Sequence, residues 1–270
     1  MTFLQVNGQS YFYECSGEGR PLLLLHGFTG SSQNWRPLVP QLATQFQVVT
    51  LDLLGHGRTA SPPEESRYTI DNAAIDLIAI LDTLQIEQVH LLGYSMGGRL
   101  ALFTAVTYPN RIHSLVLESA APGLAEAAAR QERSQRDREL ADWIEMNGIQ
   151  SFVERWQNLP LWESQKQLSV EVRQALHTQR LQNNPMGLAN SLRGMGSGAQ
   201  PSLWEYLPEL TIPVLLIAGE LDTKFVSINQ KMAANLANAR LEIVAGAGHT
   251  AHLERPYQFQ LSMEGLDDDR

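Results

Sequence analysis

The chain has 270 residues, 43% of them hydrophobic and 18% charged, a composition typical of a globular protein with one sizeable core. Its formal net charge of −9 disfavours nucleic acid or an anionic membrane as the main partner, because both need a basic surface. The single cysteine, Cys15, excludes an internal disulfide and a thiolate metal site. No apolar run is long enough to cross a membrane and no leader pattern is present, so we expect a cytoplasmic protein.

Seven short apolar runs predict β-strands, and most of them are unbroken, as in strands covered on both faces. Two helical patterns lie between them, over residues 70–84 and 97–108. This alternation predicts an α/β fold with a mostly parallel sheet and helices on both faces. The predicted strands span residues 9–14, 22–25, 47–51, 88–92, 114–118, 214–218 and 241–244.

The alternation stops between residues 122 and 208, where no strand pattern appears and the sequence becomes helical, charged and rich in Gln and Arg. The sheet pattern resumes from Pro213. We therefore predict one domain over residues 1–270, with residues 122–208 inserted in it as a helical cap above the strand ends. Residues 122–208 are called the cap segment below.

A short glycine-flanked motif, Gly93-Tyr94-Ser95-Met96-Gly97, follows an apolar strand and opens a helix. This is the context of a nucleophile elbow, a strained turn that lifts a serine hydroxyl clear of the sheet. The turn also places backbone N–H groups at the positive end of the helix. The alternative is a serine that only caps the helix.

A serine nucleophile or base requires a histidine, and the histidine requires a carboxylate that fixes its tautomer. Asp222 and His249 each follow an apolar strand further along the chain, in the loops where open α/β sheets place their sites. Their nearest competitors are Glu220, which is too close to its strand, and His252, which starts a predicted helix. The order and positions favour a catalytic triad of Ser95, Asp222 and His249.

A second turn, at residues 25–28, follows another apolar strand. In this kind of fold such a turn supplies one backbone N–H to an oxyanion hole, and the residue after the nucleophile supplies the other. We assign these donors to Phe28 and Met96. Hydrogen bonding within its loop is the favoured role of His26, and Asp52 is predicted to stabilise a turn.

A positive charge lies close to the predicted nucleophile, because Arg99 follows Ser95 by one helical turn. An exposed surface arginine is the alternative. A subset of the cap arginines that faced the pocket would bind carboxylates in paired hydrogen bonds, but spacing leaves open which ones do so. The cap arginines are Arg130, Arg133, Arg136, Arg138, Arg155, Arg173, Arg180 and Arg193.

The cap tryptophans, Trp143, Trp156, Trp162 and Trp204, favour a core role over ligand contact. No cluster of His, Asp and Glu has metal-ligand spacing, and no Gly-rich phosphate loop follows the first strand. We therefore expect no metal and no cofactor.

Several longer runs allow a family comparison. They are Gly-Tyr-Ser-Met-Gly-Gly-Arg at 93–99, Arg-Gln-Glu-Arg-Ser-Gln-Arg-Asp at 130–137, Phe152 to Trp156 with Pro160-Leu161, the run at 191–204, and Gly-Glu-Leu-Asp-Thr-Lys-Phe at 219–225. On these runs the chain resembles α/β-hydrolase-fold proteins over its whole length. More narrowly, it resembles the 2-succinyl-6-hydroxy-2,4-cyclohexadiene-1-carboxylate synthases of menaquinone and phylloquinone biosynthesis.

The resemblance implies a lyase that eliminates pyruvate from 2-succinyl-5-enolpyruvyl-6-hydroxy-3-cyclohexene-1-carboxylate, a small substrate with several carboxylates. It also implies that Arg99, Arg133 and Arg180 bind carboxylates, while Tyr94 and Trp156 line the pocket. An arginine cluster inside an acidic protein suits such a ligand.

In the mechanism that follows, His249, oriented by Asp222, draws the proton from Ser95, and the serine oxygen abstracts a ring proton. The first alternative is a serine hydrolase, either an esterase or a carbon–carbon bond hydrolase, because the same triad serves acyl transfer. The second is a non-catalytic ligand receptor on the same fold. We expect a monomer or a weak homo-oligomer.

Overall fold

The computed structural model describes residues 2–265 and contains one eight-stranded sheet in the order β1-β2-β4-β3-β5-β6-β7-β8. From β4 across to β8 the neighbouring strands are parallel, while β2 pairs antiparallel with both β1 and β4. The strands are β1 (Thr2–Val6), β2 (Gln9–Ser16), β3 (Arg20–Leu25), β4 (Phe46–Leu51), β5 (Val89–Tyr94), β6 (Ile112–Glu118), β7 (Val214–Gly219) and β8 (Ala239–Val244).

All seven predicted strands are present, and the sequence analysis missed only β1. This edge strand has only two consecutive apolar residues, Phe3 and Leu4, and Val6 is its only buried residue. It is fixed by the hairpin turn at Asn7 and Gly8, whose φ angles are 48° and 77°. Asn-Gly favours the turn in which both central residues have positive φ, so the dipeptide was the signal that could have identified the hairpin.

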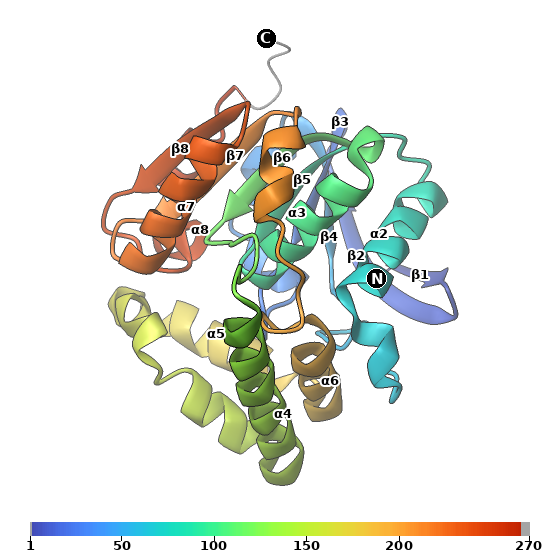
Figure 1. The fold of residues 1–270 in the computed structure, drawn as a ribbon, viewed down its shortest axis with the longest axis vertical. Helices are drawn as coiled ribbons and strands as arrows, with labels where there is room; N and C mark the ends of the chain where they lie inside the picture. Colours follow the sequence, from blue (N-terminus) through green and yellow to red (C-terminus); the bar gives the residue numbers. More distant parts are fainter. Residues whose placement is uncertain (1, 266–270) are drawn as a thin grey trace.

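Helices cover both faces of the sheet, as the alternation of the strand residues requires (Figure 1). Leu23 and Leu25 of β3 pack in one core cluster, and Leu22 and Leu24 pack in another. The first cluster includes residues of α2 (Ile70–Thr83), α3 (Met96–Thr107) and α7 (Thr223–Asn235). The second includes residues of η1 (Ser32–Trp35), α1 (Val39–Leu42), α8 (Ala251–Glu254) and α9 (Pro256–Ser262). Two short 3₁₀ helices, η2 (Glu65–Tyr68) and η3 (Pro109–Arg111), lie in connections.

The cap segment lies between β6 and β7, and every element assigned within it is helical. Figure 1 shows α4, α5 and α6 as a layer separate from the sheet. A third core cluster joins α4 to α6. The elements are α4 (Ala127–Trp156), η4 (Pro160–Gln167), α5 (Val170–Leu181), α6 (Pro185–Met195) and η5 (Trp204–Glu209).

Helix α4 is broken at Gly148, which has φ 75° and ψ 173°. A Cβ at this position would meet open space, so only the backbone conformation requires glycine there. The break divides α4 into a long first part and a short second part.

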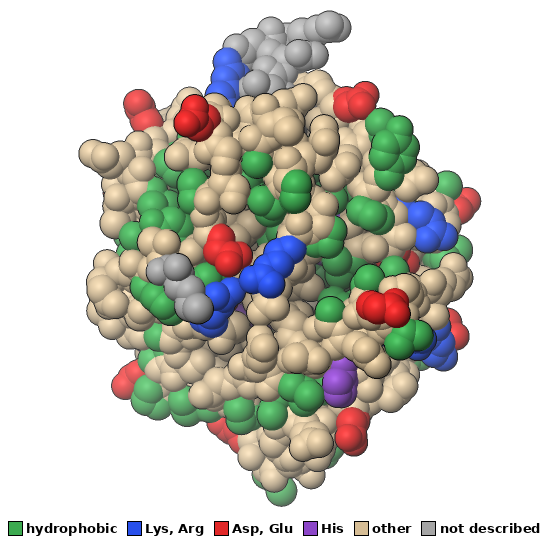
Figure 2. Space-filling model, turned by 180° about the vertical axis from the view of Figure 1, so that it is seen from behind, with side chains coloured by type: hydrophobic (Ala, Val, Ile, Leu, Met, Phe, Trp, Pro, Cys, Tyr) green, Lys and Arg blue, Asp and Glu red, His purple; other side chains and the backbone are tan. Residues whose placement is uncertain are grey.

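On the face seen from behind, Lys and Arg side chains are interspersed with Asp and Glu (Figure 2). Within residues 2–265, no helix combines the length and the apolar character needed to cross a bilayer.

Candidate active site

Ser95 lies in a sharp turn between β5 and α3, with φ 50° and ψ −106°. The chain packs so closely here that glycine is required on both sides. A Cβ on Gly93 would lie 2.4 Å from the carbonyl oxygen of Gly97, and one on Gly97 would lie 2.3 Å from that of Leu25. The predicted strand, turn and helix are therefore formed. Backbone strain of this kind costs roughly 1–3 kcal/mol and persists where the surrounding structure fixes it.

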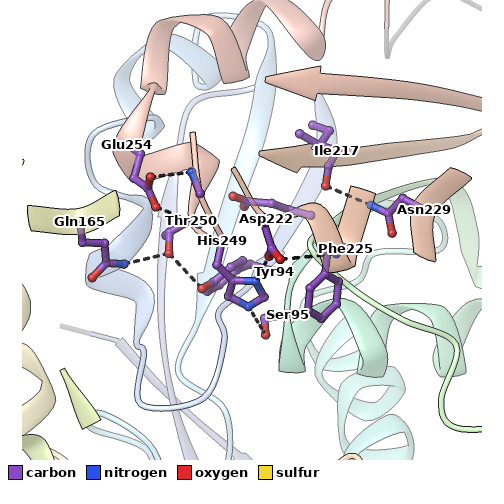
Figure 3. A network of polar contacts seen from close by, with 12 residues as sticks. Tyr94, Ser95, Gln165, Ile217, Asp222, Phe225, Asn229, His249, Thr250 and Glu254 are labelled. Carbon is purple, nitrogen blue, oxygen red and sulfur yellow. Dashed lines mark hydrogen bonds and ion pairs between the residues drawn. The ribbon is translucent and has the colours of Figure 1, made fainter. Parts of the chain in front are cut away.

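The side chains of Ser95, His249 and Asp222 meet in one hydrogen-bonded line (Figure 3). His249 Nδ1 lies 2.6 Å from Asp222 Oδ2, and His249 Nε2 lies 3.1 Å from Ser95 Oγ. When Nδ1–H donates to the carboxylate, Nε2 is free to accept the serine proton. Asp222 also caps α7 by accepting a hydrogen bond from the Phe225 N–H at 3.4 Å, which fixes the carboxylate.

Glu220 and His252, the competitors of Asp222 and His249 in the sequence, form hydrogen bonds outside the triad. The carboxylate of Glu220, an exposed residue, accepts the Gly246 N–H at 2.9 Å. His252 is fully buried and lies 2.6 Å through Nδ1 from Glu118 Oε2. In the described part of the chain, neither has a hydrogen bond to Ser95.

The two proposed oxyanion donors line the same cavity as Ser95. Met96 is the first residue of α3, where an N–H has no acceptor within the helix. The turn that presents Phe28 is fixed by His26, because His26 Nε2 accepts the Leu53 N–H at 3.0 Å and Nδ1 lies 2.8 Å from the Gly27 carbonyl oxygen. Burial lowers the pKa of His26 to about 4, so the ring is neutral at physiological pH.

Asp52 stabilises the neighbouring loop, as the sequence predicted. Its carboxylate accepts the N–H of Ser32 at 2.6 Å and that of Arg58 at 2.8 Å. The predicted structural roles of Asp52 and His26 are thus confirmed by their hydrogen bonds.

A cavity of about 420 Å³ opens onto Ser95 and has an aromatic wall. Phe28 and Trp156 are in edge contact, with ring centroids 5.3 Å apart, and Trp162 contacts both Trp156 and His249. The core role favoured for the cap tryptophans is wrong for three of the four, because Trp156, Trp162 and Trp204 line the cavity. These rings lie where the cap segment faces the sheet layer, a position that helical spacing alone does not show.

The cavity also has an excess of positive charge, because Arg99, Arg133 and Lys224 line it together with one carboxylate, that of Asp137. Arg99 Nη1 donates to the Met195 carbonyl at 2.8 Å and to Gln200 Oε1 at 3.2 Å, and in residues 2–265 Arg99 has no ion pair with a carboxylate. Burial, and then the charge of Arg133, lower the pKa of Arg99 to about 10, which leaves it charged at neutral pH. Arg133 pairs with Asp137 at 2.8 Å. The negative charge of Asp137 therefore acts on both Arg133 and Arg99.

Comparisons with known proteins identify the family of the chain. Residues 20–256 match the family model of the alpha/beta hydrolase fold. The 2-succinyl-6-hydroxy-2,4-cyclohexadiene-1-carboxylate synthase of Salmonella arizonae is 34% identical over 235 residues, 87% of this chain and 88% of its own length. The chain belongs to this family of α/β-hydrolase-fold synthases.

Two further relatives extend the match. A Bacillus subtilis protein, named as a candidate 2-succinyl-6-hydroxy-2,4-cyclohexadiene-1-carboxylate synthase, is 48% identical over 238 residues, 88% of this chain and 86% of its own length. The solved structure of MenH from S. aureus is 36% identical, with a TM-score of 0.90 over 95% of this chain and 97% of that one.

Of the predicted carboxylate binders, Arg180 is not among the residues that line the cavity. Its guanidinium lies over the ring of Trp162, 5.4 Å from the centroid, and Nη2 donates to Gln165 Oε1 at 3.3 Å. Arg180 thus lies behind Trp162, which itself lines the cavity, and its role as a carboxylate binder stays a prediction. Of the eight cap arginines, only Arg133 lines the cavity.

Sequence reasoning missed several polar residues of the cavity, among them Lys224, Gln200 and Asp137. Lys224 follows Asp222 by two residues, so its position beside the predicted acid was the available signal. Gln200 lies near the end of the cap segment, and no sequence pattern connected it with Arg99. Among the described residues, no group of three or more His, Cys, Asp or Glu could hold a metal ion.

Proposed function

We infer that this enzyme is a carbon–oxygen lyase that eliminates pyruvate from 2-succinyl-5-enolpyruvyl-6-hydroxy-3-cyclohexene-1-carboxylate. The product is 2-succinyl-6-hydroxy-2,4-cyclohexadiene-1-carboxylate, the compound for which its relatives are named. The observation that carries the inference is the Arg99 guanidinium, which lines the cavity that opens onto Ser95 and has no ion-paired carboxylate in residues 2–265. A carboxylate of the substrate supplies that partner.

The elimination needs a base, because it removes a proton from the ring carbon that bears the succinyl group. The adjacent ketone makes this proton acidic. His249, held by Asp222, takes the proton of Ser95 as the serine oxygen takes the ring proton. The electron pair moves through the ring double bond, and the carbon–oxygen bond to the enolpyruvyl group breaks. The leaving group departs as the enolate of pyruvate, and the proton that His249 took from Ser95 neutralises it and restores the neutral imidazole.

The negative charge that develops on the succinyl ketone oxygen is stabilised by the N–H groups of Phe28 and Met96. No covalent bond to Ser95 is formed in this scheme. The triad of an acyl-transfer enzyme thus works as a general base.

Three cations of the cavity receive the carboxylates of the substrate. Arg99 and Arg133 lie together at one side, and Lys224 approaches from the first turn of α7. The rings of Phe28 and Trp156 pack against the apolar part of the substrate. Tyr94 contributes a neutral hydroxyl, because burial raises its pKa well above the usual value.

Pyruvate release from the enolpyruvyl substrate, measured by coupled reduction to lactate, tests this function. The wild-type protein is expected to release pyruvate, and Ser95→Ala is expected to abolish release while the variant still binds the substrate. Absence of release by the wild-type protein would overturn the assignment. A covalent substrate adduct on Ser95, trapped during turnover, would overturn the general-base mechanism.

The serine-hydrolase alternative shares the triad and the oxyanion donors, so it is distinguished by the role of Arg99. A simple ester does not need a carboxylate receptor. Rapid turnover of p-nitrophenyl esters that is unaffected by Arg99→Ala would favour the hydrolase over the lyase.

A further inference from the structure

One buried acid beside the triad has no part in the mechanism above. Glu254 ends α8, five residues after His249, and is only 6% exposed. We propose that Glu254 is a positioning residue, which fixes the His249 imidazole against Ser95 by binding the two peptide N–H groups on either side of it. This inference rests on the proposed function, since it takes His249 to be the base that acts on Ser95.

The carboxylate of Glu254 has one oxygen for each of these N–H groups. Oε2 accepts the Gly248 N–H at 2.6 Å, and Oε1 accepts the Thr250 N–H at 3.2 Å (Figure 3). Gly248 and Thr250 are the two chain neighbours of His249. The backbone of His249 is therefore held from both sides, while its ring is held at the other end by Asp222.

The charge of Glu254 makes these contacts strong. In residues 2–265 its carboxylate forms no ion pair with Lys or Arg, and the neighbouring Arg255 guanidinium donates to the Glu254 backbone carbonyl instead. A buried carboxylate without a cation depends on its N–H donors, and hydrogen bonds to a charged acceptor are about twice as strong as neutral ones. Displacement of the His249 loop would leave this charge unsatisfied.

The loop also packs closely against the cap segment. A Cβ added to Gly248 would lie 2.0 Å from Ser164 Oγ, in the η4 helix of the cap segment. Gly248, directly before His249, is thus packed against both the cap segment and the Glu254 carboxylate. Glycine at this position permits the close approach.

Thr250 connects Glu254 with the residue that precedes Ser95. Its Oγ1 lies 3.1 Å from the Tyr94 hydroxyl and accepts a hydrogen bond from Gln165 Nε2 at 2.9 Å. Tyr94 directly precedes Ser95. Glu254 binds the backbone of the residue whose side chain contacts Tyr94, so one carboxylate influences both members of the Ser95–His249 pair.

The test uses the intact chain and a neutral fluorophosphonate, which reacts with an activated serine whatever the natural substrate is. The second-order rate constant for labelling of Ser95 is measured by mass spectrometry in the wild type, Glu254→Gln and His249→Ala. The amide retains the shape of Glu254 but keeps only one acceptor oxygen. We expect Glu254→Gln to label roughly 10- to 100-fold more slowly, because small misplacements of a catalytic group have effects of that size.

A double variant separates positioning from general structural damage. In the His249→Ala background, Glu254→Gln is expected to change the labelling rate less than twofold, since there is no imidazole left to position. A further large loss in that background would overturn the proposal. If Glu254→Gln fails to fold, Glu254→Asp, which keeps the charge but withdraws it by one methylene, must show the same dependence on His249.

The matched control is Glu220→Gln, because Glu220 accepts the Gly246 N–H at the exposed end of the same loop. It should label within twofold of the wild type. If Ser95 were labelled at the wild-type rate in Glu254→Gln but slowly in His249→Ala, only the positioning role would be rejected. Undiminished labelling by His249→Ala would reject the proposed function itself.

Discussion

Replacement of Arg99 tests the assignment of the substrate most directly. Its Nη1 group is engaged by the Met195 carbonyl and by Gln200 Oε1, which leaves Nε and Nη2 to bind one carboxylate in a paired geometry. Two hydrogen bonds to a charged group, at about 1.5 kcal/mol each, amount to about 3 kcal/mol. Arg99→Ala should therefore lower kcat/KM for pyruvate release by roughly 100-fold.

Arg99→Lys serves as the matched variant. It keeps the charge but loses the planar fork, so a smaller loss of roughly 10-fold is expected. Folding is checked by thermal unfolding, because the alanine variant leaves two buried acceptors, on Met195 and Gln200, without their donor. If folded Arg99→Ala retained kcat/KM within threefold of the wild type, Arg99 would not be a carboxylate receptor.

Three other outcomes are expected. Gln200→Glu gives Arg99 an internal carboxylate partner, so KM should rise at least tenfold with little change in kcat. An unchanged KM would contradict the role of Arg99 as a receptor for a substrate carboxylate. Gln200→Met, which adds no charge, is the control. Lys224→Met should raise KM severalfold and weaken its dependence on salt, measured between low and high ionic strength. The pKa of His26 falls from about 6.5 unfolded to about 4 in the fold, so the unfolded state binds more protons between these pH values. The free energy of unfolding should therefore drop by about 3 kcal/mol from pH 7 to pH 4 through this group. Urea titrations at both pH values measure it in the wild type and in His26→Asn. An equal loss of stability in the two proteins would refute the role of His26.

The sheet and the triad could be predicted because their signals are local. Each strand inside the sheet has its own apolar run, and Ser95, Asp222 and His249 each follow such a run. The edge strand β1 lacks one, and only the Asn7-Gly8 turn indicates it.

The cavity was less predictable, because its walls depend on how the cap segment packs on the sheet. Arg133 and Arg180 both belong to cap helices, yet only Arg133 lines the cavity. Helical spacing does not show which face of α4 or α5 meets the sheet layer. The contact between Gln200 and Arg99 joins residues 101 positions apart, and no short motif reports it.

The break at Gly148 divides one wall of the cavity between two parts of one helix. Arg133, before the break, brings charge to the wall, while Trp156, after it, brings apolar surface. Both parts pack in the core cluster that joins α4 to α6, through Ile144 before the break and Phe152 after it. A substitution that shifts one part therefore also shifts the other, so the charged and the apolar sections of the cavity wall keep a fixed spacing.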